Sequence, residues 1–292
     1  MKHSVVRFEE SNLTLPPGYG RHARGYRRAV MVDHLTAPSA VHMAHQIVQL
    51  EPGGSLETNV IAYEKSLFVL DGELDFMLDA RAYRLVRGDY ALVLAGSAHT
   101  LRSSSGNGAR WLEMIAPQPL AESVGGDTFF VGAAEWPAHV ERFDAGDART
   151  RYVGHYDDAQ LPPPGNLQMD GYSGAGAQGI RQKFMIDRTF GSAHIAMFMV
   201  EFAPGGGGSH HTHPFEESYF FLDGAGDCEF EGKKYVVEPL TCCWTGVGAK
   251  HAIYARGAAP VKFLETQTPL PPARQAFRFD SEWAEMRRRF PD

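Results

Sequence analysis

The chain has 292 residues, of which 43% are hydrophobic and 22% are charged, and this composition is typical of a globular protein. Its length allows two domains with separate cores. The formal net charge of −7 argues against a nucleic-acid partner, because phosphate binding needs a concentrated basic surface. No apolar segment has the length of a signal peptide or a membrane span, so we expect a cytoplasmic protein with no membrane partner.

Short apolar or alternating segments follow one another along the first part of the chain and are predicted to be strands. They cover residues 45–54, 66–78 and 90–101 and are broken by Pro-Gly, Asp-Gly and Ala-Gly turns. A Pro- and Gly-rich stretch then indicates a connector, and the same succession of strands returns in residues 196–206, 217–230, 233–240 and 261–266. Many short strands with few helices predict an all-β sandwich or barrel in each half.

The last segment of the chain, residues 277–292, is the one good helix candidate. Ser281 can cap this helix, Glu282 lies in its first turn and three arginines lie in its last turn, an order that suits the helix dipole. We therefore interpret the basic run as a solvated helix face rather than a nucleic-acid site.

The two halves of the chain are copies of one unit. A displacement of 152 residues aligns Pro52–His99 with Pro204–His251 without a gap, and 13 of 48 aligned positions are identical. The identities include paired glycines, an Asp-Gly turn and a final histidine in the same order. The sequence therefore indicates a tandem repeat.

The second copy carries a group of potential metal ligands. Strand alternation places His211 and His213 on one face and His210 on the other, and Glu217 has the parity to join the first face. His251 follows a later glycine turn and can close over the same centre. Three imidazoles and a carboxylate suit Mn, Fe, Co, Ni, Cu or Zn rather than a calcium cage. The alternative is an exposed histidine tract, but a carboxylate within an apolar segment needs a compensating charge.

These residues resemble the first motif of the cupin family, which reads Gly, five residues, His-x-His, three or four residues, Glu, six residues, Gly. The matching residues are Gly205, His211, His213, Glu217 and Gly224. The second motif is matched at Gly248 and His251, whereas the family's glycine, aspartate and proline are replaced by Leu240, Thr241 and Gly246.

The resemblance implies a bicupin, with two tandem double-stranded β-helix (jelly-roll) barrels, and suggests a homodimer. The expected domains are an N-terminal cupin without a metal site at 1–116, a linker at 117–170, a metal-binding cupin at 171–276 and the helix at 277–292. The first copy has Asn59, Ile61 and Lys65 where the second has its first three ligands, and retains only His99. We therefore expect one divalent metal per chain. We expect manganese, with iron, nickel or zinc as alternatives.

The order of a metal-free half, a linker and a metal-bearing half is similar to the glyoxylate-induced protein group, which includes (S)-ureidoglycine aminohydrolase, a manganese enzyme. That group usually carries Glu-x-His, three residues and His, with a glutamine from the second motif, so this chain departs from it. The leading hypothesis is a metal-dependent hydrolase or lyase for a small carboxylate, ureide or carbonyl substrate. The alternatives are an Fe(II) dioxygenase and a non-enzymatic sensor.

Four further residues are candidates for the chemistry. Tyr219 follows Glu217 on the same face and could donate to a bound anion or only line the site. Glu265 could act as general base or remain a rim carboxylate, and Gln267 shares its parity. Arg181, on the strand that opens the second half, could clamp a carboxylate or lie on the surface.

Overall fold

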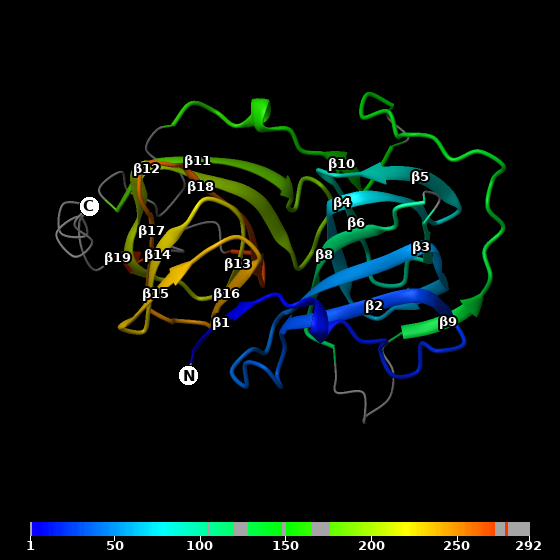
Figure 1. The fold of residues 1–292 in the computed structure, drawn as a ribbon, viewed down its shortest axis with the longest axis horizontal. Coiled ribbons are helices and arrows are strands. Elements are labelled where there is room, and N and C mark those ends of the chain that lie inside the picture. The colour runs from blue at the N-terminus through cyan, green and yellow to red at the C-terminus, as the bar shows by residue number, and fades with distance from the viewer. Residues whose placement is uncertain are drawn as a thin grey trace.

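The protein is described by a computed structural model, which covers residues 2–103, 106–119, 128–147, 150–164, 176–271 and 278–279. Nearly all of its regular structure is β-strand, and the strands form two antiparallel sheets that lie side by side (Figure 1). The all-β prediction is thus confirmed. No helix in these ranges is long and apolar enough to span a membrane.

The N-terminal sheet is built almost entirely from the first half of the chain. Its strands are β2 (Ala23–Val32), β3 (Ala44–Ile61), β4 (Glu64–Leu78), β5 (Arg81–Val86), β6 (Asp89–Val93), β7 (His99–Arg102), β8 (Ala109–Ala116), β9 (Thr128–Gly132) and β10 (Val153–His155). Strands β9 and β10 and the short 3-10 helix η3 (Asp158–Gln160) lie in the stretch predicted as a linker. That stretch therefore contributes strands to the sheet.

The C-terminal sheet repeats this arrangement. It contains β1 (His3–Arg7), β11 (Ala177–Ile186), β12 (Ala196–Thr212), β13 (Glu216–Asp223), β14 (Gly226–Phe230), β15 (Lys233–Val237), β16 (Thr241–Thr245), β17 (His251–Ala255), β18 (Val261–Thr268) and β19 (Arg278–Phe279). A 3-10 helix, η1 (Glu10–Asn12), follows β1. Most of the predicted C-terminal helix lies outside the described residues.

The repeated Asp-Gly pairs have a steric cause, although the first lies within β4 and only the second separates two strands, β13 and β14. Gly72 has φ +77° and Gly224 has φ +71°, in the left-handed region that favours glycine. A Cβ at Gly72 would overlap the carbonyl oxygen of Gly108, and one at Gly224 would overlap that of Pro260. The glycines of the repeat therefore serve the fold, independently of any ligand.

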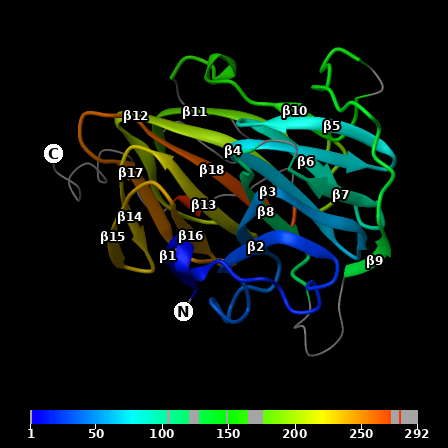
Figure 2. The ribbon, with the colours of Figure 1, turned by 45° about the vertical axis from the view of Figure 1, so that its right-hand side comes forward.

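The two sheets exchange edge strands. β1 comes from the start of the chain but pairs with β16, so that Val5 lies opposite Cys243 (Figure 2). β10 precedes the second repeat in the chain but pairs with β6 of the first repeat. Because β6 and β16 are equivalent strands of the two repeats, the exchange is reciprocal.

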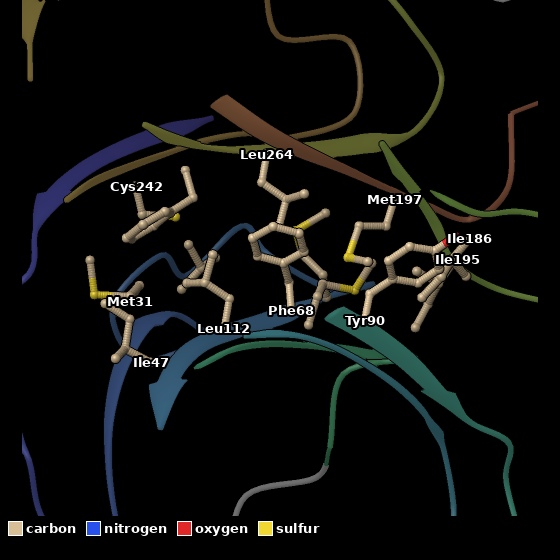
Figure 3. Packing of buried hydrophobic residues seen from close by; sticks show 14 of the residues in the cluster. Met31, Ile47, Phe68, Tyr90, Leu112, Ile186, Ile195, Met197, Cys242 and Leu264 are labelled. Atoms are coloured by element: carbon tan, nitrogen blue, oxygen red, sulfur yellow. The ribbon is translucent and has the colours of Figure 1, made fainter. Parts of the chain in front are cut away.

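One hydrophobic core joins the two sheets. Figure 3 shows buried side chains from both sheets that face each other across the interface, with Met31, Ile47, Phe68, Tyr90 and Leu112 on one side and Ile186, Ile195, Met197, Cys242 and Leu264 on the other. Each sheet also has a hydrophobic core of its own. The core of the N-terminal sheet includes Trp111, and the core of the C-terminal sheet includes Phe263. The sheets are thus packed as one body.

A pair of equivalent glutamates completes this interface. Glu64 accepts hydrogen bonds from the backbone N–H groups of Ala193 and His194 at 2.8 and 2.9 Å. Glu216 accepts them from Val41 and His42 at 2.7 and 3.1 Å. Each repeat therefore holds the loop that precedes the long strand of the other repeat.

Candidate metal centre

Three strands of the C-terminal sheet, β12, β13 and β17, carry His211, Glu217 and His251, and His213 lies just after the end of β12. His211 lies opposite His251 where β12 pairs with β17. Glu217, near the start of β13, lies opposite Gln267 of β18. The four predicted ligands, His211, His213, Glu217 and His251, are all buried, and one ligand atom from each lies within 4.8 Å of the others.

Hydrogen bonds orient the three imidazoles. The Nδ1 atoms of His211, His213 and His251 lie 2.7, 2.8 and 3.0 Å from the backbone carbonyl oxygens of Ser209, Phe215 and Ala249. A carbonyl only accepts, so each Nδ1 carries a proton and Nε2 is the nitrogen that can bind a metal. The Nε2 atoms of His213 and His251 lie 2.7 and 3.4 Å from Glu217 Oε2. This is the tautomer that a metal site requires.

The pKa values of His211 and Glu217 are both shifted in directions that suit a metal site. Burial, together with the neighbouring His251 and His213, holds the pKa of His211 well below its ordinary value. Burial raises the pKa of Glu217, but the adjacent His213 and His251 outweigh burial and lower it well below its usual range. A neutral imidazole and an ionised carboxylate are the forms that bind a cation.

A second group of polar residues surrounds Glu217. The Tyr219 hydroxyl donates to Glu217 Oε2 and lies 2.8 Å from His251 Nε2. The Gln267 amide nitrogen donates to Glu217 Oε1 at 2.6 Å and to Glu265 Oε1 at 2.8 Å. Burial, followed by the negative charge of Glu217, raises the pKa of Glu265 well above its ordinary value. Three of the four candidates for the chemistry, Tyr219, Glu265 and Gln267, thus lie at the centre.

A small cavity opens onto these residues. Its volume is about 40 Å³, and three of the four candidate ligands line it, together with Tyr219, Glu265 and Gln267. The remaining wall is mostly apolar and consists of Ile180, Gln182, Phe198, Val200, Phe202, Gly208, Ile253 and Phe263. Sequence reasoning missed most of this wall, since only strand alternation could have indicated it. A cavity of this size holds about three water-sized groups.

Two residues of the region face away from the cavity. Ile180 and Gln182 line the cavity, so Arg181 between them points to the opposite face of β11. There its guanidinium pairs with Glu201 at 2.6 Å. The role of Arg181 as a carboxylate clamp is therefore wrong for this geometry, because the strand's parity directs it outward. His210 pairs with Glu229 at 3.0 Å, on the face opposite the ligands, as its parity predicts.

The first repeat fills the equivalent position with its own cation. Lys65 is buried, and its ammonium lies 3.4 Å from His99 Nε2 and 3.7 Å from Glu113 Oε1. Although burial lowers it, the charge of Glu113 raises the pKa of Lys65 above its ordinary value. Glu113 corresponds to Glu265 of the second repeat. The second repeat has the same carboxylate but no ammonium among the described cavity residues, so a metal ion fits the missing charge.

Comparisons with known proteins support the same assignment. The cupin-domain family matches residues 46–115 and 198–266, one match in each sheet. Both halves are cupin domains. Each match covers the equivalent strands of its repeat, from β3 to β8 and from β12 to β18.

Solved bicupin structures are similar over nearly the whole chain. A formate complex of oxalate decarboxylase from Lactobacillus farciminis is 17% identical, with a TM-score of 0.67, and the match covers 94% of this chain and 88% of that one. A tryptophan-to-phenylalanine variant of oxalate decarboxylase from Bacillus subtilis is 14% identical, with a TM-score of 0.65 and coverage of 94% and 79%. At this identity the likeness shows the fold alone. No curated protein matches the chain by sequence.

Proposed function

We propose that this bicupin is a metal-dependent lyase or hydrolase, which binds a small carboxylate, ureide or carbonyl substrate at one divalent metal in the C-terminal cupin. The observation that carries the proposal is the convergence of three imidazoles and one carboxylate beside a cavity that contains a further carboxylate and no described lysine or arginine. We propose manganese as the native metal, since a mixed imidazole and carboxylate set suits it.

Each nearby residue has a part in this proposal. A divalent metal supplies Lewis-acid stabilisation of negative charge that develops on a substrate oxygen. Glu265 lies beside the ligand Glu217, and burial together with the charge of Glu217 raises its pKa, which favours the protonated form that can donate a proton to a substrate. Tyr219 and Gln267 each donate to one oxygen of Glu217 and so fix the orientation of this carboxylate. The aromatic wall excludes bulk water from the reacting groups.

The similarity of fold supports a lyase, whereas the order of the two halves along the chain supports a hydrolase. The similar structures are described as oxalate decarboxylases. The order of the two halves resembles the ureidoglycine aminohydrolase group, although the ligand order differs. In either reaction the metal would be held by His211, His213, Glu217 and His251 and would supply Lewis-acid chemistry. Glu265 would be the proton-transfer residue.

Metal analysis tests the centre itself. We expect protein purified without added metal to contain manganese, and the double substitution His211→Ala, His213→Ala to remove it. His210→Ala is the matched control, because His210 is adjacent in sequence but faces Glu229. Undiminished metal in the double variant would refute the proposal.

Activity measurements test the reaction. Small carboxylates, ureides and carbonyl compounds should be turned over by the manganese protein without oxygen, and Glu265→Gln should abolish turnover while metal content is retained. Oxygen consumption by the iron-loaded protein would instead indicate the dioxygenase. Ligand binding with no turnover of any kind would indicate a sensor.

A further inference from the structure

We infer that the C-terminal site selects a neutral or singly charged ligand that carries an N–H or O–H donor beside its metal-binding oxygen, and that it discriminates against dicarboxylate dianions. This inference rests on the metal site proposed above. It concerns which class of substrate that site accepts.

The charges around the cavity favour a ligand that carries at most one negative charge. Among the described residues that line the cavity, the acidic side chains are Glu217 and Glu265, and none is a lysine or an arginine. Two cations of the wall strands are engaged elsewhere: Arg181 with Glu201, and Lys262 with Asp158 at 2.6 Å. Because Glu217 already balances part of the charge of a divalent metal, a dianion would leave a net negative charge in the cavity with no side-chain cation from the described lining to balance it.

The cavity lining also includes a buried hydrogen-bond acceptor that has no donor among the described residues. The amide nitrogen of Gln267 has two hydrogens, and Glu217 and Glu265 accept both. The amide oxygen of Gln267 is buried and has no hydrogen-bond partner among the described residues. Gln267 itself is 1% exposed and lines the cavity. Because a buried acceptor left unsatisfied is costly, the geometry favours a ligand that donates a hydrogen bond to it.

The polar side chains of Gln267 and Tyr219 have no polar counterpart in the first repeat. Ile115 stands in the first repeat where Gln267 stands in the second, and Leu67 stands where Tyr219 does. Apart from Gln182, the other side chains of the cavity wall, including Phe198, Phe202 and Ile253, are apolar. The site therefore recognises a ligand by its metal-binding oxygen and its hydrogen-bond donor, and the rest of the ligand must be small and apolar.

A pair of chelators that differ in one hydrogen-bond donor tests the inference. Acetohydroxamate binds metals through two oxygens and carries an N–H, whereas N-methylacetohydroxamate presents the same oxygens without it. Calorimetric titration of the full-length manganese-loaded protein should show that acetohydroxamate binds about tenfold more tightly, the effect expected for one hydrogen bond. Oxalate, a dianion without a donor, should bind more weakly than acetohydroxamate.

Substitution separates the lost donor from the added bulk of the methyl group. Gln267→Leu should abolish the preference for the N–H chelator, and Gln182→Leu, the same change elsewhere on the cavity wall, should retain it. Equal binding of the two hydroxamates, a preference that survives Gln267→Leu, or tighter binding of oxalate would each overturn the inference. Failure of the protein to bind metal overturns the proposed function as well, whereas metal binding without the preference overturns the inference alone.

Discussion

Lys65 of the first cupin domain and Glu217 of the second occupy the same position of the repeat, with opposite charges. The Lys65 ammonium pairs with Glu113, whereas Glu217 lies among three histidines and near Glu265, the equivalent of Glu113. The same buried carboxylate is thus balanced by a side chain in one domain and, as we propose, by a metal in the other.

Glu217→Lys should therefore convert the second site into the type of the first. We expect loss of bound metal without unfolding, because the new ammonium can pair with Glu265 as Lys65 does with Glu113. Elemental analysis and circular dichroism measure the two outcomes. Glu217→Leu is the comparison variant: it also removes the metal, but it leaves Glu265 without a cation and should be less stable than Glu217→Lys.

Lys65→Met should destabilise the N-terminal domain. It leaves the fully buried Glu113 without its cation, a change that costs about 3–5 kcal/mol in comparable buried pairs. Denaturant unfolding measures this loss. Adding Glu113→Gln should recover much of it, and a double variant no more stable than Lys65→Met would contradict the pairing.

The equivalent glutamates of the interface should have similar effects. Glu64→Ala and Glu216→Ala each remove the acceptor of backbone hydrogen bonds across the two domains, and we expect each to lower the free energy of unfolding by about 3 kcal/mol. Glu73→Ala, which removes a half-exposed ion pair with Arg84, should cost less than about 1 kcal/mol. Equal effects of all three changes would show that the interface contacts contribute little.

His45 should make the protein sensitive to acid. Burial at the domain interface, 3.0 Å from Ser218 Oγ, lowers the pKa of His45 to about 4 from the ordinary value of 6.5. As pH falls from 6.5 towards 4, the unfolded chain binds a proton that the folded chain excludes, so stability decreases by about 3 kcal/mol across this window. Above pH 6.5 this contribution is constant.

His45→Met tests this dependence, because Met197 occupies the equivalent position in the second repeat. Unfolding free energies measured between pH 4 and 7 should depend less steeply on pH in this variant. An unchanged slope would show that other groups cause the acid sensitivity.

The sequence predicted the repeat, the all-β fold and three of the four clustered residues because each depends on local order, and it predicted His251 through its place in the second motif. Strand alternation and glycine spacing are properties of short segments, so His211, His213 and Glu217 could be placed on one face. Arg181 could not be placed, since its direction depends on the parity of β11 relative to the barrel interior. The link from Gln267 to Glu217 depends on the register between β13 and β18, which the sequence of either strand does not determine.

The exchange of β1 and β10 ties the two cupin domains into one cooperative unit. A fragment that starts at the second repeat would lack β1. The edge of β16 that pairs with β1 would then be exposed, with backbone N–H and C=O groups that have no partner. A fragment that ends with the first repeat would expose β6 in the same way. The two halves are therefore not autonomous: the first cupin domain supplies an edge strand to the domain that contains the proposed metal site.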